Sequence, residues 1–165
     1  MAGGSDQWTD WLDRHGPALV LLARQWVVGR ADAEDVVQEA FVRFWRSRHR
    51  AADPAAYLYA CVKNCALDWL RGRNRQARRE RVAARPEGEP FFDGPAEHGE
   101  RRAALAAALG ALPEAQREVV VMKIWGGLSF PQIAAALRIP PDTAASRYRY
   151  ALAKMRVQLA EEPIP

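Results

Sequence analysis

The sequence predicts an all-α protein with an N-terminal bundle of three to four helices, a flexible linker and a C-terminal helix-turn-helix domain. In both halves, apolar residues recur every three or four positions, and no stretch alternates strictly as a strand does. Between the halves, Pro, Gly and acidic residues interrupt any apolar period (AARPEGEPFFDGPAEHG). We therefore place a first domain at residues 5–82, a linker at 83–99 and a second domain at 100–160.

Three helices account for the first domain. The apolar residues of 8–26 follow a helical period, and this helix is expected to end near the next glycine. Asp32 and Asp35 resemble an N-terminal capping pair, behind which an apolar stripe runs to Trp45. A third helix is expected to begin at the pair Asp53-Pro54 and to end at the pair Arg71-Gly72.

Strong start and stop signals divide the second domain. The tripeptide Leu-Pro-Glu at 112–114 starts a helix, and the two glycines at 126–127 end it. Ser129 and Gln132 form a capping box that opens a short helix. The tight connection 138–141 then leads into a longer helix over 142–159. A short helix, a tight turn and a longer helix predict a helix-turn-helix.

The net charge of +4 conceals a strong asymmetry along the chain. Residues 1–40 carry three basic and seven acidic side chains, a net of −4, whereas residues 41–82 carry eleven basic and three acidic ones, a net of +8. A basic segment next to an acidic one indicates one surface for a polyanion and another for a different partner.

Composition excludes several classes of protein. The chain is 49% hydrophobic, yet no apolar run approaches the roughly 20 residues of a membrane span, and the N-terminus lacks a signal peptide pattern, so we expect an intracellular protein without membrane insertion. Cys61 and Cys65, four residues apart, are expected to be a buried thiol pair. No phosphate-binding glycine loop, metal-ligand cluster or catalytic triad motif occurs, so we expect no catalytic residues, metal or cofactor.

The longer helix of the predicted helix-turn-helix carries donors suited to a DNA major groove. Side chains near the N-terminus of such a helix reach base edges, while flanking basic residues contact phosphates. The alternative is a solvated amphipathic helix with a charged face. The candidate DNA-binding residues are Thr143, Ser146, Arg147, Arg149 and Tyr150.

A second candidate DNA surface lies at the end of the first domain. Six of the eleven residues 71–81 are Arg, a density that phosphate contacts would explain, although a solvated tail would also account for it. Aromatic and amide side chains just before this segment suit the stacking and edge recognition of unpaired bases, although these aromatics could instead be core. The candidates are Tyr57, Lys63, Asn64, Asp68, Arg71, Arg73 and Arg75.

These segments resemble the extracytoplasmic-function sigma factors of the sigma-70 family. DAEDVVQEAFVRFW (residues 32–45) is similar to the family's polymerase-binding helix, and AYLYACVKNCALDWLRGRNR (56–75) to its minus-10-reading and promoter-melting helix in sigma region 2. Residues 112–156 resemble the minus-35-reading domain, sigma region 4. Three such motifs in order, with a linker between them, are a specific signal.

The resemblance implies a division of labour in a cytoplasmic, nucleoid-associated protein. By this resemblance, the segment 47–53 would lie where the family receives a flipped base, and the linker would run through the polymerase toward the RNA exit path. Its implied partners are core RNA polymerase, promoter DNA and an anti-sigma factor, and it implies no cofactor. The polymerase would meet the polar side of the second helix, at Asp35, Gln38, Glu39 and Arg43.

The second domain departs from the family at four positions. The family commonly has Gly where Arg138 stands, Ser at Pro140, a basic residue at Ala145 and Arg at Tyr150. Losing one base contact changes discrimination by roughly 1–3 kcal/mol. We therefore expect an unusual minus-35 sequence, or greater use of phosphate contacts and DNA shape.

Two other functions compete with the sigma-factor hypothesis. A free-standing helix-turn-helix regulator would bind specific duplex DNA without polymerase, but it leaves the first domain unexplained. A helical adaptor would bind protein or RNA through the basic surface and show no preference for promoter DNA. An enzyme, such as a small recombinase, would need a nucleophile domain that the sequence lacks.

Overall fold

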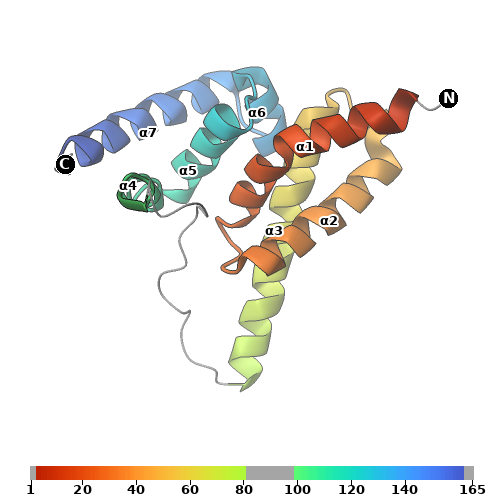
Figure 1. Ribbon diagram of the computed structural model, residues 1–165, viewed down its shortest axis with the longest axis horizontal. Helices are drawn as coiled ribbons and strands as arrows, with labels where there is room; N and C mark the ends of the chain where they lie inside the picture. The colour runs from red at the N-terminus through yellow and green to blue at the C-terminus, as the bar shows by residue number, and fades with distance from the viewer. Residues whose placement is uncertain (1–2, 81–98, 162–165) are drawn as a thin grey trace.

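The computed structural model describes residues 3–80 and 99–161, and the described residues form helices joined by short connections (Figure 1). The expected linker, apart from Gly99, lies outside the described residues. The first half contains α1 (Gly3–Ala23), α2 (Arg30–Ser47), the 3₁₀ turn η1 (Arg48–Arg50) and α3 (Pro54–Glu80). The second half contains α4 (Gly99–Gly110), α5 (Glu114–Val120), the π-helical turn η3 (Val121–Trp125), α6 (Phe130–Leu137) and α7 (Pro141–Glu161). The expected all-α fold is confirmed.

The first half is a bundle in which α1, α2 and α3 pack together around Phe44 and Leu58, both fully buried. The Trp8 ring lies edge-on to the Phe44 ring, with 5.2 Å between their centroids, and ties the start of α1 to α2. Asp53 caps α3 as expected, because its Oδ1 accepts from the amide of Ala56 at 3.1 Å. These contacts fix the directions in which α2 and α3 present their polar sides.

Two boundaries of the first half differ from the sequence prediction. The cap of α2 is Gly29, without a side-chain bond, and Asp32 lies inside the first turn, where a negative charge still favours the helix dipole. Helix α3 does not end at Gly72 but continues to Glu80. Arg, Gln and Ala are good helix formers, so one interior glycine, unfavourable by about 1 kcal/mol, does not stop the helix.

The second half contains the expected helix-turn-helix, α6 followed by α7. The capping box is confirmed: Ser129 Oγ accepts from the amide of Gln132 at 3.2 Å, and the Gln132 side chain accepts from the amide of Ser129 at 2.9 Å. The turn after α6 places Arg138 in the left-handed region, with φ 56° and ψ 48°. The glycine that the family favours at this position would adopt that conformation without strain.

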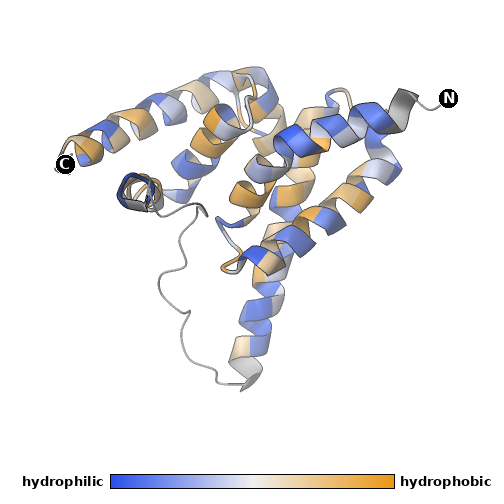
Figure 2. Ribbon diagram, viewed as in Figure 1, coloured by the Kyte–Doolittle hydropathy of each residue, from blue (hydrophilic) through white to orange (hydrophobic). Residues whose placement is uncertain are grey.

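The two halves share a single apolar core. Helices α3 and α6 lie in contact, as do α1 and η3, and the buried residues form one cluster from Ala18 to Met155. In Figure 2 the C-terminal part of α1 and much of α6 are hydrophobic, whereas the lower part of α3 is mostly hydrophilic and extends beyond the body. The structure therefore docks the second half on the first.

Candidate nucleic-acid interface

The polar side of α2 is exposed along its length. Asp35, Gln38, Glu39 and Arg43 are all exposed, while Val36 and Ala40 between them are buried. The pattern arises because buried and exposed positions alternate every three or four residues in an amphipathic helix. The four residues proposed to bind polymerase thus share one accessible helix face.

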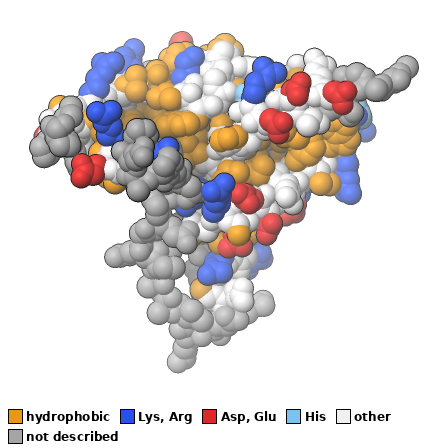
Figure 3. Space-filling view, in the orientation of Figure 1, with side chains coloured by type: hydrophobic (Ala, Val, Ile, Leu, Met, Phe, Trp, Pro, Cys, Tyr) orange, Lys and Arg blue, Asp and Glu red, His pale blue; other side chains and the backbone are white. Residues whose placement is uncertain are grey.

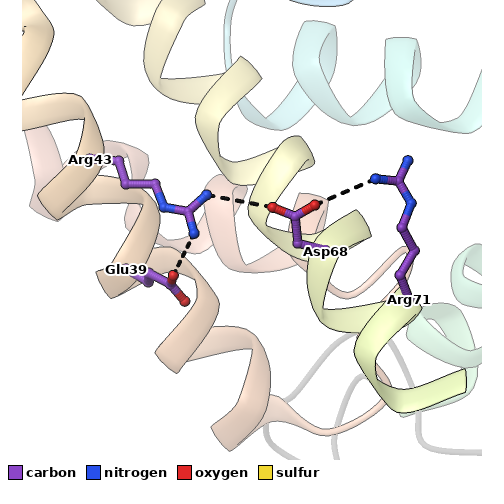
Figure 4. Close-up of polar contacts among 4 residues, drawn as sticks. All are labelled: Glu39, Arg43, Asp68 and Arg71. Carbon is purple, nitrogen blue, oxygen red and sulfur yellow. Dashed lines mark hydrogen bonds and ion pairs between the residues drawn. The ribbon is translucent and has the colours of Figure 1, made fainter. Parts of the chain in front are cut away.

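An ion-pair network joins this face of α2 to α3 (Figure 4). Arg43 Nη2 donates to Glu39 Oε1 at 2.7 Å, and Arg43 Nη1 lies 3.5 Å from Asp68 Oδ2. Arg71 Nη1 lies 3.5 Å from the other oxygen of Asp68. All four side chains are about half-exposed or more, so each pair contributes little to stability, about 0–1 kcal/mol. The network instead aligns the candidate polymerase-binding residues with the candidate minus-10 residues.

An exposed stripe follows α3 from this network toward its free end. Asn64, Asp68, Arg71 and Arg75 are exposed and recur at intervals of four and three residues, which places them on one side of the helix. This stripe presents an amide group, a carboxylate and two guanidinium groups to solvent. It is suited to contact a base edge near its start and phosphates near its end.

Two other candidates on α3, Tyr57 and Arg73, have different surroundings. The Tyr57 ring is half-buried, with its centroid 5.9 Å from that of Phe44, so it belongs mainly to the core. Trp69 is also half-buried, and the exposed Arg73 lies 5.6 Å from its ring centroid. This cation–π contact holds Arg73 beside the helix rather than on the exposed stripe.

Lys63 faces the second half instead of solvent. Its Nζ lies 2.8 Å from Oε2 of Glu118 on α5, and the two side chains are only 23% and 5% exposed. The ammonium group also lies 5.9 Å from the ring centroid of Trp26. Lys63 is about 100° round the helix from Asn64, which explains why neighbours in sequence reach different surroundings.

Burial perturbs the ionisation of Glu118. Desolvation raises the pKa of this carboxyl, as does the nearby negative charge of Glu114. The hydrogen bond and positive charge of Lys63, and more weakly the charge of Arg147, act in the opposite direction without cancelling the rise. The charges of candidate DNA-binding cations from both halves of the chain thus lower the pKa of this one carboxyl, against the larger effect of its burial.

The candidate residues of α7 also divide by helix face. Thr143, Ser146, Arg147 and Tyr150 share one side, whereas the buried Ala144, Ala151 and Met155 lie on another. Tyr150 is 58% exposed, and Arg149, off this stripe, lies over its ring at 5.7 Å. The stripe begins within the first turn of α7, the position from which a helix-turn-helix reads base edges.

The segment 47–53 forms η1 and the bend before α3. Arg48 donates to the carbonyl of Trp45, and its guanidinium stacks 3.6 Å from the centroid of the Trp45 ring. These contacts hold the start of the segment against the C-terminal end of α2.

Charge is distributed unevenly over the face of the molecule shown in Figure 3: acidic side chains gather over α1 and basic ones lie over α7.

Among the described residues, no three His, Cys, Asp or Glu side chains are placed to hold a metal ion. Helices in the same part of the chain are too short or too polar to span a bilayer. Cys61 and Cys65 are buried free thiols, as expected, and burial raises the pKa of each.

Sequence reasoning missed the contacts between the halves. Trp26 Nε1 donates to Glu114 Oε1 at 2.9 Å across 88 residues of sequence, beside the Lys63–Glu118 pair. The available signal was Glu118 itself, an acidic residue placed directly before the apolar run VVVM. An acid adjoining a buried helix segment requires a partner, but the sequence does not identify it.

Comparisons with known proteins agree with this architecture. Residues 11–76 match the sigma-70 region 2 family and residues 102–155 match the sigma-70 region 4 family. The RNA polymerase sigma-E factor of Streptomyces avermitilis is 33% identical, over 86% of this chain and 79% of its own length. The ECF RNA polymerase sigma factor SigL of Mycobacterium tuberculosis is 32% identical, over 90% of this chain and 86% of its own.

Two solved structures share the fold. The sigma factor RpoE of Bartonella quintana, crystallised with the anti-sigma factor NepR, has a TM-score of 0.71 and 22% identity, covering 95% of this chain and 99% of its own. CnrH, in complex with the cytosolic domain of CnrY, has a TM-score of 0.66 and 26% identity, covering 98% and 93%. Two family matches in order, together with relatives of comparable length, show that this chain belongs to the extracytoplasmic-function sigma factors of the sigma-70 family.

Proposed function

We propose that this sigma factor binds core RNA polymerase through α2, reads the minus-10 element through α3 and reads the minus-35 element through α7. The observation that carries this assignment is the presence of separate polar stripes on three helices. The α2 stripe contains Asp35, Gln38 and Glu39, which suits a protein partner, whereas the stripes of α3 and α7 contain amide, hydroxyl and guanidinium donors suited to DNA.

A free-standing regulator would use the α7 stripe alone. It would leave the exposed stripe of α3 and the acidic face of α2 without a role. The family match over residues 11–76, in addition to that over 102–155, therefore favours the polymerase subunit. Such a subunit acts in the bacterial cytoplasm, at the nucleoid, and the chemistry of RNA synthesis stays with the core enzyme.

An anti-sigma factor is proposed as a further partner. Of the two solved structures described above, one holds a sigma factor in complex with the anti-sigma factor NepR, and the other holds CnrH in complex with the cytosolic domain of CnrY. A partner of this kind should compete with core polymerase for the exposed face of α2. Full-strength binding to core enzyme in the presence of a candidate anti-sigma protein would count against that candidate.

The experiment that tests the function is transcription from a promoter library by sigma-free bacterial core polymerase, with and without this protein. We expect new start sites that share two spaced upstream elements. Specific duplex binding by the protein alone, without new transcripts, would instead support a free-standing regulator. Neither activity, with the core enzyme of a related bacterium, would support an adaptor.

Two substitutions assign the elements. Arg147→Ala should reduce minus-35 discrimination by about 1–3 kcal/mol. Asn64→Ala should impair minus-10 use or opening and leave the minus-35 preference unchanged. Arg156→Ala is the matched control, because Arg156 is exposed on α7 but lies off the stripe. Wild-type promoter preferences in both test variants would reject these assignments.

A further inference from the structure

We infer that Cys61 and Cys65 form a dithiol site for a thiophilic metal or metalloid centre that takes two sulfur ligands, and that its occupancy disturbs the α2 face. Neither thiol has a part in the functions assigned to α2 and α3 above. The consequence for polymerase rests on the proposed function, because it assigns the α2 face to core enzyme. The binding site itself does not depend on that assignment.

Both thiols lie at the interface between α2 and α3. Cys61 and Cys65 are 8% and 4% exposed. Burial raises the pKa of each thiol, and the positive charge of Arg43 on α2 lowers both. Arg43 is therefore close to both sulfur atoms, and the pair is covered by a side chain of the neighbouring helix.

The spacing of the two cysteines favours a bridging atom over a disulfide. Both lie in the regular part of α3, four residues apart. Cβ atoms at this spacing are about 5–6 Å apart, whereas a disulfide requires about 3.5–4.5 Å. A disulfide would therefore distort α3 where it packs against α2. An atom bound between the two sulfurs spans the larger separation without moving the backbone.

The number and type of donors select the ligand. Thiolates are soft ligands and prefer soft, thiophilic centres to hard cations. The sequence has two cysteines, and in the described part of the chain no third His, Cys, Asp or Glu completes a metal site with them. A structural zinc ion requires four ligands and does not fit. A monosubstituted arsenic(III) centre, which has two exchangeable positions, does.

Binding of such a centre requires no oxidant or reductant. Phenylarsine oxide reacts with both thiols: two As–S bonds form, the arsenic–oxygen bond and two S–H bonds break, and the oxygen leaves as water with both protons. Arsenic stays trivalent throughout. The second As–S bond forms within one molecule, at an effective thiol concentration in the millimolar range.

Slow alkylation of these thiols is compatible with such a site. A reagent that reacts with one thiol, such as iodoacetamide, must finish its reaction before a brief local opening closes again. Exchange of thiols at arsenic is reversible, and the product with two As–S bonds accumulates at equilibrium. Burial therefore slows entry of the centre without preventing its binding.

Arg43 links the dithiol site to the α2 face. Its guanidinium group donates to Glu39 at 2.7 Å and lies 3.5 Å from Asp68 (Figure 4). A bound centre is larger than the two protons it replaces, and Val62 and Ala66 beside the thiols are fully buried. The half-exposed Arg43 can move more easily than these core residues. Occupancy should therefore separate Arg43 from its partners on both helices.

The test uses phenylarsine oxide and the full-length, reduced protein. Native mass spectrometry should show one phenylarsenic group per chain, with the helical circular dichroism signal unchanged. Competition with dithiothreitol measures the affinity. Cys61→Ala and Cys65→Ala should each weaken binding by about 100-fold or more, because one thiol loses the gain of a linked second contact.

A matched control keeps two cysteines in the wrong geometry. Cys65→Ala combined with Leu67→Cys places the thiols six residues apart, about 120° round the helix from each other. Leu67 is half-buried, so the new thiol stays in a similar environment. This variant should bind as weakly as the single substitutions. If it does not fold, the two single variants carry the comparison.

Three results would overturn the dithiol site: no adduct on wild type, an adduct that forms only as the helical signal is lost, or equal affinity for wild type and the variant with displaced thiols. Each would leave Cys61 and Cys65 as ordinary core residues. Circular dichroism of every variant before addition of the probe separates lost binding from lost structure.

Binding to core polymerase is measured with loaded protein freed of excess reagent, so that the polymerase is not modified. We expect about tenfold weaker binding than for the unloaded protein, within the usual range of coupling between two sites. Equal binding would refute the link to the α2 face. Failure of the unloaded protein to bind core enzyme would instead refute the proposed function, while mass spectrometry still decides whether the dithiol site exists.

Discussion

Replacing Gly126 by alanine tests the contact between the two halves through stability. The added Cβ would lie 2.6 Å from the carbonyl oxygen of Met122 and 2.8 Å from the hydroxyl oxygen of Tyr59. Neither atom can withdraw easily: Met122 belongs to the preceding helical turn, and Tyr59 is buried and hydrogen-bonded to His15. Gly126 itself has φ −80°, which alanine adopts freely, so the effect is purely steric.

The expected loss is about 1–3 kcal/mol in the free energy of unfolding, the usual effect of overpacking a filled core. For a chain of this size it lowers Tm by about 2–4 °C per kcal/mol. Urea denaturation, followed by circular dichroism and tryptophan fluorescence, measures the change. Adding Tyr59→Phe should recover part of the loss, because it removes one of the two obstructing oxygens.

Gly72→Ala is the matched control. Gly72 lies inside α3, and a Cβ added there would have nothing within 4 Å, so alanine should stabilise the chain by up to about 1 kcal/mol through helix propensity. The two glycine variants should thus change stability in opposite directions. A Gly126→Ala protein as stable as wild type would refute the described packing of η3 against α3.

Further predictions concern charge, pH and thiols. Asp35→Arg should weaken binding to core polymerase in a pull-down titration, whereas Asp13→Arg, an equal change on the exposed part of α1, should not. Because the pKa of Glu118 is raised, the folded chain binds this proton at higher pH than the unfolded chain does, so its contribution to stability is present in acid and is lost as the pH rises through that pKa. Glu118→Gln should remove this part of the pH dependence of urea unfolding. Cys61 and Cys65, buried with raised pKa values, should resist iodoacetamide until the protein unfolds, and rapid alkylation of the native chain would contradict their burial.

Local features could be predicted from the sequence because their causes lie within a few residues. The capping box of Ser129 and Gln132 and the cap at Asp53 are formed by neighbours three residues apart. The apolar period of α2 likewise determines which of its side chains are exposed. The predicted end of α3 at Gly72 was wrong, because the glycine was given more weight than the helix-forming residues around it.

The candidate site divides in the same way. Periodicity was sufficient to group the stripes of α2, α3 and α7, and the family resemblance supplied their roles as hypotheses. Neither periodicity nor the resemblance could show that Lys63 pairs with Glu118, 55 positions later, or that Arg43 pairs with Asp68 on another helix. Those contacts depend on how whole helices pack.

The sequence by itself determined where the helices lie, the capping residues of α3 and α6 and the exposed faces of the helices, because hydrogen bonds and amphipathic patterns act over one or two turns. Only the tertiary structure decided that both halves share one core and that two acids of α5 bind Lys63 and Trp26. The reason is physical: an apolar face specifies that it must be buried but not against which partner, since hydrophobic attraction is non-directional.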